Sequence, residues 1–393
     1  MTDALVSNYC CYEDIEIVHL VPLGKSEYCK KGMEKHFRHN SLFVGPTTRQ
    51  AISEGRGDFT PAFLHEIPNL IRTKLAPDVA LLHLSKPNKL GYCSFGISVD
   101  YSKPAAHCSK MNIAQINSNM PFTFGDSMIH ISMLDYIVES DTPLLELTPP
   151  SIGDTERAIG ENVAQLINDG DTLQLGIGAI PDAVLKSLKT KNDLGLYTEM
   201  FSDGVIDLIE TGVITNAKKN IHQGKSVASF MMGSRRLYDY VDNNPNIEMY
   251  PVDYVNNPRI ASQNDNLISV NSCIQVDLLG QVVSDSVGLL QISGVGGQVH
   301  FVRSAAMSKG GKSIIAFAST AKGGTVSKIV SFIDKGSAVT TSRNDVEYIV
   351  TEYGIANLKG SSLRQRAYDL IQIAHPDFRE DLKKEYNKRF EKR

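Results

Sequence analysis

The sequence contains few residues that could build a metal centre or a disulfide framework. Its cysteines occur without C-x-x-C spacing, and its ten histidines form no H-E-x-x-H motif. Zinc sites need clustered cysteine or histidine ligands, and small disulfide-bonded domains need paired cysteines. We therefore expect reduced thiols and neither a structural nor a catalytic metal. The six cysteines are Cys10, Cys11, Cys29, Cys93, Cys108 and Cys273.

An excess of charge and long apolar runs are also missing. The formal net charge is -4 over 393 residues with both signs mixed along the chain, which predicts no basic surface for nucleic acid or lipid headgroups. No apolar run approaches the roughly 20 residues of a transmembrane helix, and the first residues lack a basic stretch followed by an apolar one. We expect a cytoplasmic protein without membrane or nucleic-acid partners.

The chain does contain short apolar runs that alternate with segments of helical periodicity. This alternation is typical of an α/β fold with largely parallel strands. The sequence TPPSIGDTE at 148–156 interrupts it with two prolines and a glycine, so we predict two domains, 1–150 and 151–393. The strand candidates include 15–24, 78–85, 111–117 and 142–147 in the first half, and 172–178, 194–198, 266–272, 313–319 and 347–354 in the second.

The segment LYTEMFSDG, residues 196–204, leads from a predicted strand into the start of a helix and contains Glu199. In open α/β sheets, ligands bind beyond the carboxyl ends of the strands. A carboxylate at such a junction is therefore a candidate for chemistry. The alternative is a solvated or helix-capping carboxylate, which position alone does not exclude.

Two glycine-containing turns are candidates for binding a ligand. TLQLGIGAIPDAVL at 172–185 joins a strand to a helix through Gly176 and Gly178, and it lacks the third glycine of a dinucleotide fingerprint. Its helix start would suit a carboxylate, a phosphate or a developing oxyanion. SGVGGQVHF at 293–301 is compatible with a ligand loop or a tight hairpin. Between them, Asn256 and Asn257 precede Pro258, a pattern that is common in turns.

Several long motifs, in this order, resemble the acetyl-CoA hydrolase/transferase family. They are LGIGAIPDAVL, LYTEMFSDGVIDLIETG, SGVGGQVHFVRSA, STAKGG and VTEYGIANLKG in the second half. In the first half, FVGPTTRQAISEGRGDFTPAFLHEIPNLI, GYCSFGISVDYSKPAAH and MPFTFGDSMIHIS are similar to its amino-terminal domain. The resemblance covers nearly the whole chain and is closest to the CoA-transferases that act on short acids such as 4-hydroxybutyrate and butyrate.

The resemblance implies two similar open α/β domains with the active site between them. It makes Glu199 the nucleophile of a ping-pong CoA transfer through a glutamyl-CoA thioester, with Asn256 and the backbone N–H of Gly297 as oxyanion donors. Coenzyme A is then a substrate, and no other cofactor is expected. Relatives also suggest a homodimer or larger homo-oligomer. By resemblance the substrate is bound by Gly176, Gly178, Gly296, Lys322 and Lys328, with surface solvation as the alternative for the two lysines.

Two alternatives remain open: an acyl-CoA hydrolase, in which water resolves the thioester, and a degenerate CoA-binding protein without turnover.

Relatives begin with a further helix, strand and loop. Without that strand, we expect unpaired backbone groups, an exposed apolar face and reduced stability or activity in the first domain. Gln275 and His300 stand where relatives usually carry acidic residues, and we expect the altered charge at His300 to change the acid preference or the polarity of the site.

Overall fold

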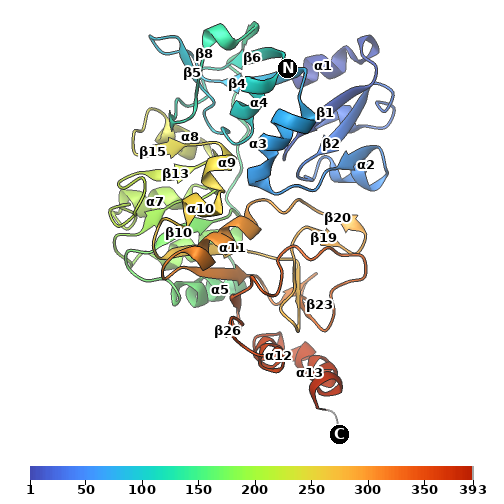
Figure 1. The fold of residues 1–393 in the computed structure, drawn as a ribbon, viewed down its shortest axis with the longest axis vertical. Coiled ribbons are helices and arrows are strands. Elements are labelled where there is room, and N and C mark those ends of the chain that lie inside the picture. Colours follow the sequence, from blue (N-terminus) through green and yellow to red (C-terminus); the bar gives the residue numbers. More distant parts are fainter. Residues whose placement is uncertain (392–393) are drawn as a thin grey trace.

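The computed structural model describes residues 1–391, which form two α/β parts in succession (Figure 1). The second part is built on one six-stranded sheet with strand order β11-β10-β16-β21-β25-β26. All neighbours in it are parallel except β25 and β26. The strands are β11 (Gly195–Leu196), β10 (Thr172–Leu175), β16 (Leu267–Asn271), β21 (Lys312–Ala316), β25 (Tyr348–Thr351) and β26 (Gly354–Asn357).

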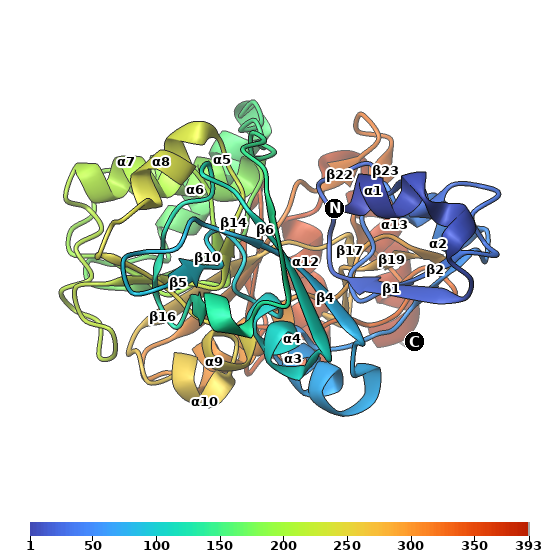
Figure 2. The ribbon, with the colours of Figure 1, turned by 90° about the horizontal axis from the view of Figure 1, so that it is seen from above.

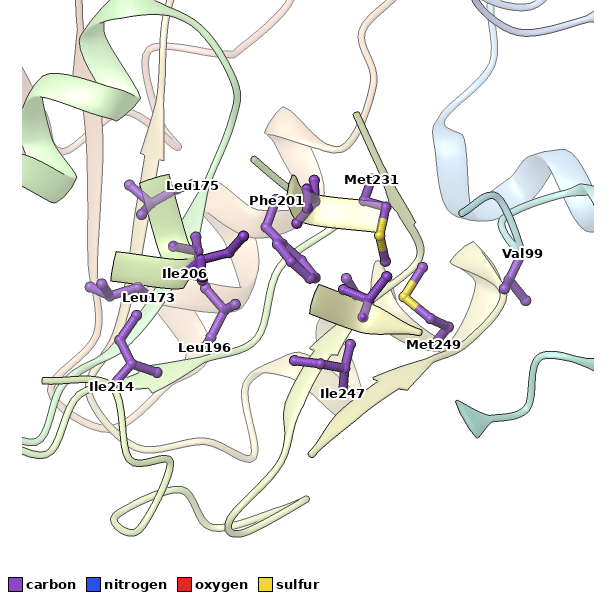
Figure 3. Packing of buried hydrophobic residues seen from close by; sticks show 14 of the residues in the cluster. Val99, Leu173, Leu175, Leu196, Phe201, Ile206, Ile214, Met231, Ile247 and Met249 are labelled. Carbon is purple, nitrogen blue, oxygen red and sulfur yellow. The ribbon is translucent and has the colours of Figure 1, made fainter. Parts of the chain in front are cut away.

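Helices cover this sheet, which explains why its strands read as continuous apolar runs rather than as alternating patterns. Every residue of β10 is buried. The side chains of Leu173, Leu175 and Leu196 pack with Ile206 and Ile214 in a single core (Figure 3). The helices are α5 (Asp154–Ala164), α6 (Ala179–Ser187), α7 (Gly204–Glu210), α8 (Arg235–Val241), α9 (Val252–Val255), α10 (Pro258–Ala261), α11 (Gln298–Met307), α12 (Leu363–Gln372) and α13 (Pro376–Phe390).

The strands of the first part form two separate three-stranded parallel sheets, β1-β2-β3 and β4-β6-β9, which run in different directions in Figure 2. The first sheet contains β1 (Ile15–His19), β2 (Phe37–Ser41) and β3 (Gly57–Phe59). The second contains β4 (Val79–Leu84), β6 (Met111–Ile116) and β9 (Tyr136–Glu139). The helices are α1 (Thr2–Ser7), α2 (Arg49–Ser53), α3 (Ile67–Leu70) and α4 (Ser102–Cys108). The α/β class is confirmed, but the two sheet systems are less alike than expected.

One face of the β4-β6-β9 sheet is apolar and exposed. Along β4, exposed and buried residues alternate, so Leu82 and Leu84 are buried while Val79 and Leu81 are not. On β9, at the other end of this sheet, Tyr136 keeps 60% of its surface exposed. Among the described residues, β1 pairs only with β2, and β4 only with β6. Each sheet therefore has an unpaired edge.

The two parts interlock through a shared sheet. Strand β7 (Phe124–Gly125) of the first part pairs in parallel with β15 (Ile247–Met249), which also pairs with β13 (Ser226–Ala228). Val99 of the first part and Met231, Ile247 and Met249 of the second belong to one hydrophobic cluster (Figure 3). Two other short pairs are β5 (Tyr92–Ser94) with β8 (Met128–His130), and β12 (Met200–Phe201) with β14 (Phe230–Met231).

The stretch from 275 to 330 forms small sheets and hairpins before and after α11. Strand β17 (Gln275–Asp277) pairs with β18 (Val282–Val283) and β24 (Ile329–Val330). The hairpins are β19 (Ser286–Val287) with β20 (Leu290–Gln291), and β22 (Thr320–Ala321) with β23 (Val326–Ser327). Residues 293–301 are not a hairpin, because this glycine segment runs into α11.

The strand predicted at 142–147 is wrong: residues 140–153 contain neither helix nor strand. Their backbone groups find partners outside any sheet, since the N–H of Leu147 donates to the Gly233 carbonyl at 2.9 Å and the Leu145 carbonyl accepts from the Tyr238 hydroxyl at 2.9 Å. The boundary at 150 lies in this segment and stays a prediction. Within residues 1–391, no helix is both long enough and apolar enough to cross a membrane.

Candidate active site

Glu199 lies between β11 and β12, at the carboxyl end of the sheet, and is half-buried. Its backbone is held on both sides. The hydroxyl of the preceding residue, Thr198, donates to the Leu175 carbonyl at 2.9 Å, and the Glu199 carbonyl accepts the N–H groups of Ser229 at 2.9 Å and Phe230 at 3.2 Å. These bonds fix the main chain at the position from which the carboxylate extends.

The first glycine turn follows the neighbouring strand. Gly176 comes directly after Leu175, to which Thr198 is bonded, so the turn begins one strand away from Glu199. Gly178 precedes α6 with φ at +118°, a conformation that favours glycine. The N-terminus of α6 therefore opens at the same edge of the sheet as the nucleophile candidate.

Asn256 and Gly297 meet Glu199 from two other elements, at the end of α9 and the start of α11. The amide Nδ2 of Asn256 donates to Oε2 of Glu199 at 2.6 Å, and Asn256 is fully buried. A Cβ atom added at Gly297 would overlap this same oxygen and the Asn256 amide nitrogen. The structure thus brings together three residues that are far apart in sequence, with Glu199 and Asn256 separated by 57 positions.

The other carboxylate oxygen, Oε1, lies on the side of Gly296 and the Phe43 ring. A Cβ added at Gly296 would lie 3.8 Å from Oε1 and 3.5 Å from Cε2 of Phe43, and Gly296 has φ at +58°. Phe43 belongs to the first part of the chain, directly after β2. The ring therefore contributes an apolar wall from the first domain next to the predicted substrate-binding glycine.

Burial raises the pKa of Glu199 to about 7. The hydrogen bond from Asn256 lowers this pKa, the negative charge of Asp100 raises it, and the Gly297 N–H lowers it. A carboxylate with such a pKa is more basic, and hence a better nucleophile, than one in water, while a large fraction of it is still ionised at neutral pH.

Asp100 was not singled out in the sequence, although it lies within the quoted motif GYCSFGISVDYSKPAAH. It is buried, and its Oδ1 accepts hydrogen bonds from the hydroxyls of Ser98 and Ser102, both at 3.1 Å. Its backbone N–H donates to the Ser229 carbonyl at 3.3 Å, and its carbonyl accepts from Val252 at 3.1 Å. Burial raises the pKa of Asp100 to about 6. The only local signal was an acid between two serines after a strand.

The lysines predicted to bind CoA lie on and beside the β22-β23 hairpin. Lys322 is exposed at its turn, with φ at +49°. Lys328 is half-buried, with Nζ 4.9 Å from the centre of the Phe317 ring, and burial lowers its pKa.

His300 is buried in α11 rather than displayed as a charge in the site. Its ring packs edge-on against His65, with centroids 4.0 Å apart, and against Phe63. Burial lowers its pKa to about 3, so the ring is neutral at physiological pH. The ring thus adds no charge to the site, and the effect of a neutral ring in place of an acidic residue on the polarity of the site stays a prediction. Gln275 pairs with Asp334, with Nε2 donating to Oδ2 at 3.1 Å.

Two surface cavities lie apart from these residues. One of about 650 Å³ lies between α5 and α6, and one of about 470 Å³ is lined by residues of both domains, including Lys103, Tyr250 and Asp253. Glu199 lines neither. Among residues 1–391, no group of three or more His, Cys, Asp and Glu side chains is arranged to hold a metal ion.

Comparison with known proteins agrees with this arrangement. Residues 7–147 match the acetyl-CoA hydrolase/transferase N-terminal domain, and residues 233–386 match the C-terminal domain of the same family. The 4-hydroxybutyrate coenzyme A transferase of Clostridium kluyveri is 61% identical over 391 residues, which cover 99% of this chain and 91% of that protein.

Two solved structures are also similar. RipA from Yersinia pestis superposes with a TM-score of 0.92 at 38% identity, covering 96% of this chain and 88% of RipA. A 4-hydroxybutyrate CoA-transferase (abfT-2) from Porphyromonas gingivalis superposes with a TM-score of 0.81 at 43% identity, covering 99% and 96% of the two chains. The protein described here belongs to the acetyl-CoA hydrolase/transferase family.

Proposed function

We propose that this enzyme transfers CoA between a short-chain acyl-CoA and a carboxylic acid, and that Glu199 carries the CoA as a thioester between the two half-reactions. The enzyme is a CoA-transferase, and the similar transferase of Clostridium kluyveri indicates acids such as 4-hydroxybutyrate. The observation that supports the role of Glu199 is the contact of its Oε2 with the Asn256 amide at 2.6 Å, beside Gly297.

The first step is attack of a Glu199 oxygen on the thioester carbonyl carbon of acyl-CoA. The carbon–sulfur bond breaks, CoA leaves as the thiolate, and a mixed anhydride joins Glu199 to the acyl group. Oε1 suits this attack, because it lies on the side of Gly296 and Phe43 and leaves Oε2 with its donor. Acylation removes the buried negative charge of Glu199. The desolvation that raises its pKa therefore favours the step.

The second step transfers CoA onto the enzyme. The thiolate attacks the glutamyl carbonyl carbon, the bond to the acyl oxygen breaks, and the free carboxylic acid leaves as its anion. The negative charge of this tetrahedral intermediate develops on Oε2, which already contacts Asn256 and Gly297. An incoming carboxylate then attacks the glutamyl thioester and runs the two steps in reverse. The product is a new acyl-CoA and a free Glu199.

The remaining site predictions extend this arrangement. Gly176 and Gly178 lie at the sheet edge beside Glu199, where close backbone approach suits a bound ligand. Lys322 and Lys328 are proposed to contact the phosphates of CoA as cations, a role that their place around the β22-β23 hairpin permits. A homodimer or larger homo-oligomer and a cytoplasmic location stay predictions from the sequence.

The experiment that tests this proposal is incubation with acetyl-CoA or butyryl-CoA followed by mass spectrometry of the peptide that contains Glu199. The expected result is CoA attached at Glu199 in the wild type and no adduct in Glu199→Gln. An adduct on another residue, or one that survives the substitution, would refute the role of Glu199. Exchange of labelled CoA that requires an added carboxylate supports transfer, whereas thioester loss at the same rate without a carboxylate identifies hydrolysis.

A further inference from the structure

The loop that carries Gly297 rests on the first domain. Arg49, the first residue of α2, donates from Nε at 3.1 Å and from Nη2 at 2.7 Å to the carbonyl oxygen of Ile292. These two bonds join residues that are 243 positions apart. Ile292 begins the segment that ends at Gly297, five residues later, so Arg49 holds the start of the loop that brings this glycine to Glu199.

Other contacts restrain the same loop along its length. The N–H groups of Ile292 and Ser293 donate to the Asp285 carbonyl at 2.8 and 3.2 Å. At Gly294 the first domain comes so close that an added Cβ would lie 3.0 Å from Cδ2 of Phe43 and 3.1 Å from the Leu42 carbonyl oxygen. The loop is thus held between a turn of its own domain and the segment after β2. On the side of the first domain, Arg49 makes the polar contact with the loop, and Leu42 and Phe43 make the close packing contacts.

The guanidinium of Arg49 differs from the others in the first domain. Arg38, Arg56 and Arg72 each pair with a carboxylate, whereas Arg49, which is half-buried, has no carboxylate within 4.0 Å among residues 1–391. Its charge is directed at a single main-chain carbonyl, and hydrogen bonds from a charged donor are stronger than neutral ones. A side chain committed in this way to one loop is suited to fix that loop in place.

We propose that Arg49 is a positioning residue that holds the Gly297 N–H opposite Glu199, so that the first domain sets the geometry of an oxyanion donor in the second. This inference rests on the proposed role of Glu199 and Gly297. Because a misplacement of about 1 Å can cost on the order of 100-fold in rate, loss of the Arg49 contact should lower turnover without weakening substrate binding in proportion.

The test compares Arg49→Met with Arg235→Met. Arg235 is a matched control, because its Nη1 also joins the two domains, donating to Oδ1 of Asn119 at 3.1 Å, but it lies in α8 and contacts neither the glycine loop nor α9. We expect Arg49→Met to lower kcat about 10- to 100-fold and to slow formation of the CoA adduct equally, with KM for acyl-CoA changed less than about threefold. Arg49→Lys, which retains a charged donor, should recover part of the loss. Arg235→Met should stay within about twofold of the wild type.

Two results overturn the inference. If Arg49→Met and Arg235→Met lose the same activity, the contact of Arg49 with Ile292 is only one of several that join the domains. If Arg49→Met forms the CoA adduct at the wild-type rate, the loop keeps its working position without the hydrogen bonds from Arg49 to Ile292. If the wild-type enzyme forms no CoA adduct on Glu199, the proposed function itself is wrong. This result differs from the two above, so failure of the proposed function can be told apart from failure of the inference about Arg49. Thermal unfolding of each variant shows whether lost activity reflects lost folding.

Discussion

The two domains differ most in how completely their sheets are closed. The second domain has one continuous six-stranded sheet buried under helices, whereas the strands of the first are divided between two three-stranded sheets, one with an exposed apolar face. Glu199, the proposed nucleophile, and the two residues at its carboxylate, Asn256 and Gly297, all belong to the second domain. The first contributes Phe43, Arg49 and Asp100, which support or border the site. The proposed chemistry thus lies on the more fully packed domain, and the first domain supplies residues that border or support it.

Gly297→Ala is expected to have the largest effect. An added Cβ would overlap both Oε2 of Glu199 and Nδ2 of Asn256, so the substitution displaces the nucleophile and an oxyanion donor together. Since loss of one donor costs about 10²- to 10³-fold in kcat, we expect a greater loss here. Steady-state kinetics would measure it. Activity within tenfold of the wild type would contradict the described geometry.

Asn256→Ala is expected to lower kcat by about 10²- to 10³-fold, because it removes one oxyanion donor. The neighbouring Asn257 provides a matched control: its side chain accepts from the Arg259 N–H at 3.0 Å and caps α10. Asn257→Ala should cost about 1 kcal/mol of stability and leave kcat within a few-fold. Equal kinetic losses in the two variants would show that Asn256 acts only through the fold.

Glu199→Gln should stabilise the protein at pH 8 by about 1 to 3 kcal/mol relative to the wild type. Its pKa of about 7 lies above the ordinary value of 4.5, so the folded state binds the proton more tightly than the unfolded state. The stability that protonated Glu199 contributes is present below pH 4.5 and is lost as the pH rises towards 7. The difference between the proteins should vanish at pH 4.5. Denaturant unfolding at both pH values tests this.

Asp100→Asn should shift the acidic limb of the pH–rate profile to lower pH. The charge of Asp100 raises the pKa of Glu199, and removing it lets the nucleophile ionise at lower pH. The less basic carboxylate should also lower the limiting rate at high pH, by less than about tenfold. An unchanged limb would mean that the first domain does not act on the nucleophile electrostatically.

The smallest effect is expected on the exposed face of the first domain. Leu81→Thr should change the free energy of unfolding by less than about 0.5 kcal/mol, because Leu81 is 42% exposed. Leu82→Ala, at the next position of the same strand, should cost about 2 to 5 kcal/mol, because Leu82 is 3% exposed. Denaturant unfolding would measure both. Similar losses would show that the Leu81 face is covered in solution.

The second domain was the more predictable from sequence, because its strands are buried on both faces and read as unbroken apolar runs. The segment 142–147 has the same composition but lies at the surface along α8, and local pattern cannot reveal such a tertiary neighbour. For the same reason the sequence did not reveal that Phe63 and His65 of the other domain pack against His300.

The candidate site was predictable only in part. Glu199 stood out by its place after a strand, but Asn256 looked like an ordinary turn residue, and only the family resemblance connected it with Gly297. Arg49 and Asp100 were missed, although both lie in motifs that carried the resemblance. Their roles depend on contacts with Ile292, Ser229 and Val252, which lie more than 100 positions away along the chain.

Strand β7 has a consequence for how this protein could be divided experimentally. A cut anywhere between 140 and 153 would place β7 and β15 on different fragments, so β15 would lose its pairing with β7. The Asp242 carboxylate, which accepts from the Phe122 N–H at 2.7 Å, would also lose its donor. Halves produced separately would therefore have to recombine to regain these bonds, which makes the protein a natural candidate for fragment complementation rather than for study as isolated modules.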